Sequence, residues 1–430
     1  MKVRTLLFWP HLIAGVVAGA VILVMSVTGV LLTYERQLIA WSNGDYRSQP
    51  PPADARRMPV EQVLGAFAES GFGEATNVAV GSEATDPVIV SAGQRTFYLD
   101  AYSGRFLGEG RQGMREFMSD MRAWHRWLAY EGEGRVTARA VTGWSNVAFL
   151  FIVVSGLYLW FPRRWTWQHL RPVIWFTRGA RGKARDFNWH NAIGAWCLVP
   201  LFIVVISAVP ISFPWGNDLV YRAMGEEPPA RRGVGGGEQA RGGGRGARGG
   251  AGAPQREGAG PQRDGGGARN PLAGAAGLDG LLTRASRQEP EWQSISVRIP
   301  ESPRGPVAFA IDRGDGGQPQ LRSTLTLDRD GAALSYEDFS TQTPGRQMRS
   351  IMRFAHTGEV LGLPGQTIAG IATAGSVVLV WTGIALALRR GRAWIGRRAR
   401  TAETVRASAP QPQGASLAGA PMNRVEESRW

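Results

Sequence analysis

The stretch RFAHTGEVLGLPG, residues 353–365, places one of the chain's five histidines, His356, just before a long apolar run from Ile368 to Leu388. That run can cross a bilayer, which takes about 20 residues in a helix. A histidine in or near hydrocarbon is costly, so it is a candidate functional residue. His356 therefore directs attention to the other histidines and to the other apolar runs.

The composition limits the classes of protein that the chain can belong to. A formal charge of +14 could indicate nucleic-acid binding, but many arginines flank apolar runs and others lie in a Gly-rich tract. We therefore expect no nucleic-acid partner. The single cysteine, Cys197, cannot build a disulfide framework, a zinc site or an iron–sulfur cluster.

Four apolar runs are long enough to span a membrane. They are Leu12–Thr33, Trp144–Phe161, Asn191–Phe213 and Ile368–Leu388. The first resembles a signal peptide, but it is too long and lacks a small-residue cleavage pattern, so we expect a retained anchor. These runs predict a multi-pass membrane protein whose partner is the lipid bilayer.

The short flanks of these runs predict their orientation. Lys and Arg gather before the first run, between the second and third, and after the fourth. By the positive-inside rule these regions, and both termini, are cytoplasmic. The two long loops, about 36–140 and 216–360, then face outward, which in a Gram-negative bacterium is the periplasmic side of the inner membrane.

Each outward loop contains a short helical pattern followed by strand-like runs, which predicts a small α+β unit. Such a unit buries little core alone, so we expect the two units to pack on each other or on the membrane domain. Residues 228–271 are dominated by Gly, Arg, Ala and Pro and are expected to be disordered, as is the tail.

The order histidine, span, outward unit, histidine, span occurs twice, in residues 1–165 and 186–390. Because each copy has two spans, both copies have the same orientation. The predicted fold is a four-helix transmembrane bundle built as a parallel two-fold repeat, with two small α+β periplasmic units. The expected segments are 1–40 (first span), 41–115 (first unit), 116–165 (outer interfacial helix and second span), 166–188 (cytoplasmic loop), 189–215 (third span), 228–271 (insert), 275–345 (second unit), 346–390 (outer interfacial segment and fourth span) and 391–430 (disordered cytoplasmic tail).

Four histidines occupy matching positions in the two copies. His11 and His190 begin the first and third spans at the cytoplasmic end, and Gly15 and Gly194 follow four residues later on the same helix face. Each glycine leaves a gap beside an imidazole that a flat macrocycle could use. His125 and His356 precede the second and fourth spans on the outward side.

Neutral imidazole is a good iron ligand, and two imidazoles can occupy both axial positions of a haem. We therefore predict two bis-histidine haems b, one held by His11 and His190 and one by His125 and His356. The alternatives are that the histidines cap helices or bond to backbone, or that they bind zinc or copper, which would need further ligands. His169 has no counterpart in the other copy, and we expect a structural or interfacial role for it.

Several motifs resemble the PepSY-associated transmembrane family, across about residues 5–165 and 185–395. They are His125-Arg126-Trp127-Leu128, Ser155-Gly156 to Pro162-Arg163-Arg164, the His356-Thr357-Gly358-Glu359 block to Gln366, Thr382-Gly383 with Arg389-Arg390, Thr28-Gly29, and Tyr98-Leu99-Asp100 to Arg105, which is similar to the terminal hairpin of a PepSY unit. The third span has Ser207-Ala208 where a Thr-Gly or Ser-Gly pair would recur.

The resemblance implies an inner-membrane haem protein that reduces ferric siderophores, or another ferric chelate, in the periplasm. It assigns the haem-ligand role to His11, His125, His190 and His356. No nucleotide-binding fold is recognisable, so the electron donor would be a separate cytoplasmic protein, reduced flavin or a quinol. Two alternatives stay open: a non-enzymatic membrane protein whose PepSY-like units bind a peptide or protease or sense a ligand, and a haem electron carrier with another acceptor.

Overall fold

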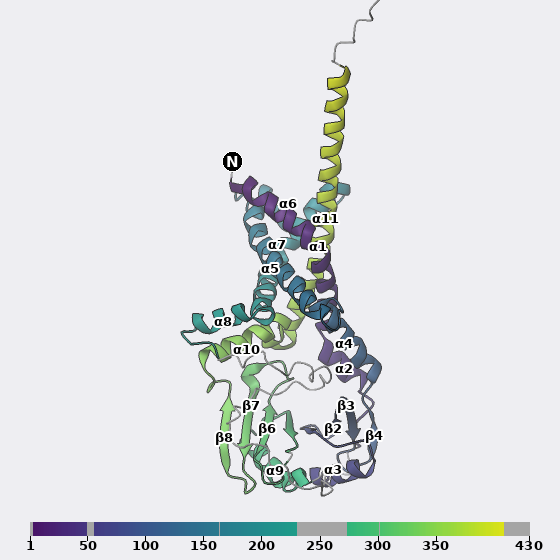
Figure 1. The fold of residues 1–430 in the computed structure, drawn as a ribbon, viewed down its shortest axis with the longest axis vertical. Helices are drawn as coiled ribbons and strands as arrows, with labels where there is room; N and C mark the ends of the chain where they lie inside the picture. The colour runs from purple at the N-terminus through teal and green to yellow at the C-terminus, as the bar shows by residue number, and fades with distance from the viewer. Residues whose placement is uncertain (1–2, 50–55, 163, 230–272, 301, 408–430) are drawn as a thin grey trace, which may run out of the picture.

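The computed structural model describes residues 3–49, 56–162, 164–229, 273–300 and 302–407. A helix bundle occupies one end and a β-sheet the other, with four shorter helices between them (Figure 1). Most of the predicted insert (228–271) and residues 408–430 of the predicted tail lie outside the described residues.

The four predicted spans are confirmed as long apolar helices. They are α1 (Val3–Leu32), α5 (Gly134–Trp160), α7 (Gly182–Ser212) and the first part of α11 (Gly362–Ala407). Their outer surfaces expose large apolar side chains, as hydrocarbon contact requires. Helices α5 and α7 begin before the apolar runs, and the short helix α6 (Trp167–Ile174) lies between them.

Small residues bring the spans together. Helices α1 and α7 each contact both α5 and α11, so each span has two principal neighbours. Ser376 donates a buried hydrogen bond of 2.7 Å to Ser26, and a Cβ at Gly375 would lie 2.6 Å from the Sγ of Cys197. Close backbone approach through small residues is typical of helix packing in membranes.

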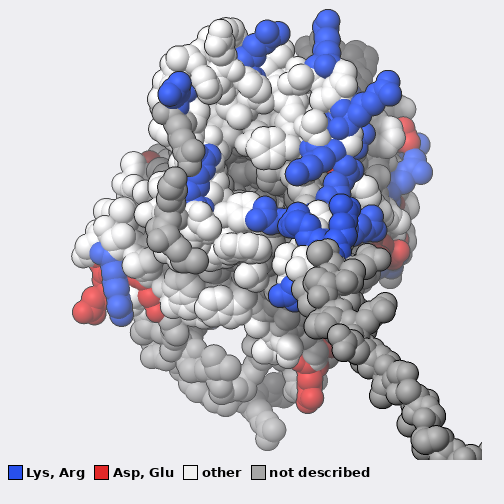
Figure 2. Space-filling view, turned by 90° about the horizontal axis from the view of Figure 1, so that it is seen from above, with Lys and Arg blue, Asp and Glu red and all other residues white. Residues whose placement is uncertain are grey.

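The predicted disorder of residues 391–430 is wrong for residues 391–407, which continue α11 beyond the bundle (Figure 1). Arg and Ala favour helix, and the Arg398 guanidinium lies 4.0 Å from the centre of a Trp394 ring. Viewed from this end, the surface gathers Lys and Arg side chains along one side (Figure 2).

The two outward units form one eight-stranded antiparallel sheet in the order β4-β3-β2-β1-β5-β6-β7-β8. The strands are β1 (Asn77–Gly81), β2 (Val88–Ala92), β3 (Arg95–Leu99), β4 (Phe106–Glu109), β5 (Ser294–Arg298), β6 (Val307–Asp312), β7 (Arg322–Leu327) and β8 (Ala333–Asp338). Strands β1 and β5 pair along their full length, from Asn77 with Arg298 to Gly81 with Ser294. The expectation that the units pack on each other is therefore confirmed.

One face of this sheet carries the apolar core. Alternate residues of the strands are buried, as in β7, and they pack with α3 (Val60–Glu69) and α9 (Leu278–Gln288). Because the core is continuous across β1 and β5, neither unit's half of the sheet is complete alone.

Phe309 on β6 tests this shared core. Its side chain is fully buried, so we expect Phe309→Ala to cost about 3–5 kcal/mol through lost burial and a cavity. Thermal unfolding followed by limited proteolysis of the sheet measures the loss. Phe106→Ala removes a ring that is 43% exposed and should change stability much less; equal losses would contradict a common core.

Four helices lie between the bundle and the sheet (Figure 1). They are α2 (Glu35–Ser42), α4 (Gln112–Trp127), α8 (Pro214–Ala223) and α10 (Pro344–Thr357). Helix α10 ends at Gly358, whose φ of 77° suits glycine, and the 3₁₀ turn η4 (Glu359–Leu361) leads into α11. His125 and His356 lie in the last turns of α4 and α10.

Candidate functional site

The structure brings His125 and His356 together at the sheet end of the bundle. Their ring centroids lie 6.2 Å apart and the ring planes are inclined by 54°. The Nδ1 atom of His125 lies 2.9 Å from the carbonyl oxygen of Met25 on α1, and that of His356 lies 2.8 Å from the carbonyl oxygen of Val204 on α7. A carbonyl oxygen only accepts, so Nδ1 carries the proton and Nε2 keeps its lone pair.

At the opposite end, His11 on α1 and His190 on α7 have hydroxyl partners. His11 Nδ1 lies 2.9 Å from Ser155 Oγ, and His190 Nδ1 lies 3.0 Å from Thr382 Oγ1. The hydroxyl of Ser155 donates to the Phe151 carbonyl and that of Thr382 to the Val378 carbonyl. Each hydroxyl has one proton, so its oxygen accepts from Nδ1, and Nε2 is again available to bind a metal.

Two of the rings meet a span in the same way. His125 contacts the Met25 carbonyl, three residues before Thr28, and His356 contacts the Val204 carbonyl, three residues before Ser207. Thr28 Oγ1 lies 3.2 Å from His125 Nδ1 as well. An outer acceptor of this kind fixes the tautomer and the ring orientation of a metal-binding histidine.

The glycines of the Thr-Gly and Ser-Gly pairs make room for these rings. A Cβ at Gly29, Gly156 or Gly383 would lie 3.3–3.4 Å from the Cε1 atom of a histidine, which is tighter than ordinary contact. These pairs are visible in the sequence, but their role in making room for an imidazole ring was not predicted. A signal for this role was present. Each span carries one Ser or Thr followed by a small residue, and the chain has one candidate histidine for each span.

Neither Gly15 nor Gly194 packs against a histidine ring. A Cβ at Gly15 would meet nothing within 4 Å, and one at Gly194 would meet only Leu379 Cδ2, at 3.7 Å. Both positions therefore leave room in the protein. The expectation that a macrocycle uses this room stays a prediction.

His125 and His356 are held in the neutral form. Burial, reinforced by the neighbouring His356, lowers the pKa of His125 to about 4. Burial also lowers the pKa of His356. At neutral pH both rings are therefore uncharged, which is the form that binds a metal.

Within the described residues, no group of three or more His, Cys, Asp or Glu side chains could hold a metal ion. The described residues thus supply only imidazole nitrogens, and no carboxylate or thiolate cluster, as candidate ligands. His169 lies apart on α6, where its Nδ1 is 2.7 Å from Thr166 Oγ1.

Comparison with known proteins identifies the family. The family model of the PepSY-associated TM region matches residues 8–390, which include the four predicted apolar runs and His11, His125, His190 and His356. The chain belongs to the PepSY-associated TM family. The resemblance stated from the motifs is thereby confirmed. No curated protein matches the chain.

Proposed function

We propose that this PepSY-associated membrane protein is a di-haem electron carrier that passes electrons from the cytoplasmic side to a periplasmic ferric chelate, most simply a ferric siderophore. The 6.2 Å spacing of the His125 and His356 rings carries the proposal. A metal bound by two imidazoles, about 2 Å from each nitrogen, would hold ring centres about 6 Å apart. The spacing of the outer pair would therefore let both rings bind the same haem iron.

The chain would hold one haem b at each histidine pair. Bound haem supplies one-electron redox chemistry. The residues supply ligation by Nε2, a fixed tautomer through the carbonyl and hydroxyl acceptors, and exclusion of water by the packed spans. His11 and His190 each precede the contact carbonyl of their own helix, Met25 or Val204, by fourteen residues, which is about 21 Å of helix at 1.5 Å per residue.

This equal spacing supports the parallel repeat. In the proposal α1 corresponds to α7, α4 to α10, α5 to α11, and the strands β1–β4 to β5–β8. His11 then corresponds to His190 and His125 to His356. In this proposal the two copies would contribute one histidine each to each pair.

The orientation follows from the charges. The end opposite the sheet carries the Lys- and Arg-rich flanks of the spans, which the positive-inside rule assigns to the cytoplasm. The sheet is then periplasmic in a bacterial inner membrane. A separate cytoplasmic protein, reduced flavin or a quinol would supply the electron at the His11 and His190 level.

The proposed reaction is the transfer of one electron to a ferric ion in its chelate, giving the ferrous chelate and an oxidised donor. No bond to the protein forms and no general acid or base is needed. Most siderophores hold ferric iron much more strongly than ferrous iron, so reduction releases the metal. The protein would then act as an oxidoreductase of the ferric-chelate reductase class.

Visible absorbance of the purified protein tests the proposal. After expression with added haem, we expect a low-spin b-type spectrum that changes on dithionite reduction, and two haems per chain. Reduced protein should then be oxidised by ferric chelates faster than in uncatalysed controls. A colourless protein would sink the proposal and favour a peptide-binding or sensory role for the sheet; a haem protein inert to ferric chelates would point to another acceptor.

Thr382 gives a finer prediction. We expect Thr382→Val to raise the midpoint potential of the inner haem, because loss of the hydroxyl acceptor weakens the imidazole as a donor to ferric iron. The change is modest, about 1 kcal/mol, because the imidazole loses one neutral hydrogen bond. A redox titration measures it. Thr401→Val, which alters an exposed hydroxyl bonded to Arg397, should shift neither potential; equal shifts in both variants would refute the role of Thr382.

A further inference from the structure

Two consecutive residues just after α1, Glu35 and Arg36, form ion pairs close to the two outer histidines. Glu35 pairs with Arg122 on α4, three residues before His125. Arg36 Nη2 lies 3.0 Å from Glu359 Oε1, three residues after His356. Glu35 and Arg36 thus contact both elements that carry the outer histidines. Each contact lies within about one helical turn of the histidine.

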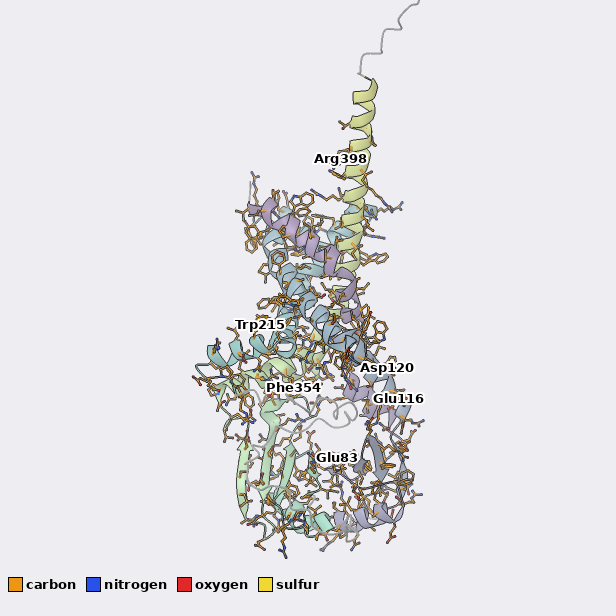
Figure 3. All side chains as sticks on the ribbon, in the orientation of Figure 1. Glu83, Glu116, Asp120, Trp215, Phe354 and Arg398 are labelled. Carbon is orange, nitrogen blue, oxygen red and sulfur yellow. The ribbon has the colours of Figure 1, made fainter. Side chains whose placement is uncertain are left out.

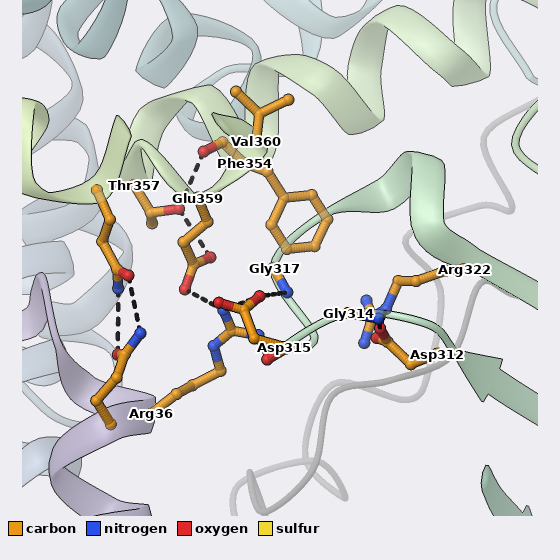
Figure 4. Close-up of polar contacts among 12 residues, drawn as sticks. Arg36, Asp312, Gly314, Asp315, Gly317, Arg322, Phe354, Thr357, Glu359 and Val360 are labelled. Atoms are coloured by element: carbon orange, nitrogen blue, oxygen red, sulfur yellow. Dashed lines mark hydrogen bonds and ion pairs between the residues drawn. The ribbon is translucent and has the colours of Figure 1, made fainter. Parts of the chain in front are cut away.

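Glu359 is fixed from two sides. The Thr357 hydroxyl donates to its Oε2 atom at 2.9 Å, and Arg36 binds its other oxygen (Figure 4). Arg36 also donates through Nη1 to the Asp315 carbonyl at 2.7 Å. The loop between β6 and β7 closes around this contact, because a Cβ at Gly317 would lie 2.8 Å from the Cβ of Glu359.

The segment that carries Glu35 and Arg36 is itself anchored to α11. Gln37 Nε2 donates to Gln366 Oε1 at 2.8 Å, and the Tyr34 hydroxyl lies 2.8 Å from Thr367 Oγ1. Gln366 also donates to the carbonyl of Thr33 at the end of α1. The segment that forms the ion pairs is therefore held in place by hydrogen bonds to α11.

Burial distinguishes these pairs from ordinary surface pairs. The Arg36 and Glu359 side chains are 35% and 14% exposed and those of Glu35 and Arg122 are 25% and 20% exposed, whereas Arg111 and Asp45, which pair near the start of α4, are 54% and 79% exposed. Exposed pairs contribute about 0–1 kcal/mol and are screened by salt. Partly buried pairs are screened less, and removing one partner leaves the other unpaired.

We propose that Glu35 and Arg36 are positioning residues for the outer histidine pair, an inference that rests on the proposed function. Their ion pairs hold α4 and the turn after α10 against the end of α1, and so set the spacing and inclination of the His125 and His356 rings. Asp315 extends the same network to the sheet, where the acceptor would bind.

Electron paramagnetic resonance of the oxidised haem protein tests the proposal, because the signal of a bis-histidine haem depends on how the two ring planes are inclined. We expect Glu35→Gln and Arg36→Gln to shift or broaden the signal of one haem and to alter its potential, with two haems retained and the other signal unchanged. Arg36→Lys should restore part of the native signal. Arg111→Gln breaks the exposed pair with Asp45 at the start of α4 and should leave both signals unchanged.

A distance measurement keeps the test independent of haem. Spin labels attached through Asp120→Cys on α4 (Figure 3) and Ser350→Cys on α10 report the separation of the two helices. We expect a broader distance distribution in Arg36→Gln than in Arg111→Gln. Unchanged outer-haem signals and distances in both Glu35→Gln and Arg36→Gln would overturn the proposal. A protein without haem in which the labelled distances broaden would instead contradict the proposed function alone.

Discussion

His356→Ala is expected to reduce the haem content from two to one per chain and to abolish reduction of ferric chelates. The variant removes one of the two imidazoles that face each other at 6.2 Å, and no third ligand is available nearby among the described residues. Removing the ring frees the Val204 carbonyl but leaves His11, His190 and their hydroxyl partners in place. The remaining haem should therefore still be reduced by dithionite.

Haem quantification, difference spectra and chelate reduction in membrane vesicles give the readout. His125→Ala should reproduce the result, because it removes the other ligand of the same pair. His169→Ala is the matched control, since that ring binds only Thr166 at the surface of α6 among the contacts described, and it should retain both haems. Loss of both haems, or of neither, in His356→Ala would contradict the pairing of His125 with His356.

The spans and the proximity of His125 to His356 could be predicted from sequence because their signals are local or periodic. An apolar run of about 20 residues has few folded forms other than a membrane helix. The His-x-x-x-Gly pattern at His11 and His190, and the matching place of His125 and His356 before a span, indicated which rings share a level. The structure keeps His125 and His356 at one end, as that pattern predicted.

The hydroxyl acceptors could not be predicted because their contacts are not local. Ser155 and His11 are 144 residues apart, and Thr382 and His190 are 192 apart. Only the packing of α5 on α1, and of α11 on α7, brings them together. The pairing of β1 with β5 has the same cause, since it joins strands separated by two spans.

The third span shows how a departure from the pattern is accommodated. Ser207 donates to the Val204 carbonyl at 2.9 Å, and His356 binds the same carbonyl at 2.8 Å. The backbone acceptor for His356 is therefore present even though the glycine is missing from this span. Ala208 in place of glycine leaves this contact with the carbonyl intact. The position of the His356 ring therefore depends on the helix backbone more than on the side chain.

Gly15→Leu separates the needs of the protein from those of a bound macrocycle. In the protein alone a Cβ at Gly15 meets nothing within 4 Å, and leucine favours helix over glycine by roughly 0.8–1 kcal/mol. The variant should therefore insert and fold at least as well as the natural chain. If the room beside His11 receives a haem, a leucine side chain fills it, and we expect the inner haem to be lost while the outer one stays.

Haem content and the midpoint potential of the remaining haem measure this effect. Gly194→Leu is expected to act in the same direction, because Gly194 stands in the same relation to His190 and its nearest side-chain neighbour, Leu379 Cδ2, lies 3.7 Å from the added Cβ. Gly391→Leu is the control. A Cβ at Gly391 also meets nothing within 4 Å, but this residue of α11 lies beyond the level of the histidines. Full retention of two haems with native potentials in Gly15→Leu would show that the space beside His11 is not where a cofactor lies, and the inner site would then have to extend toward another face of α1.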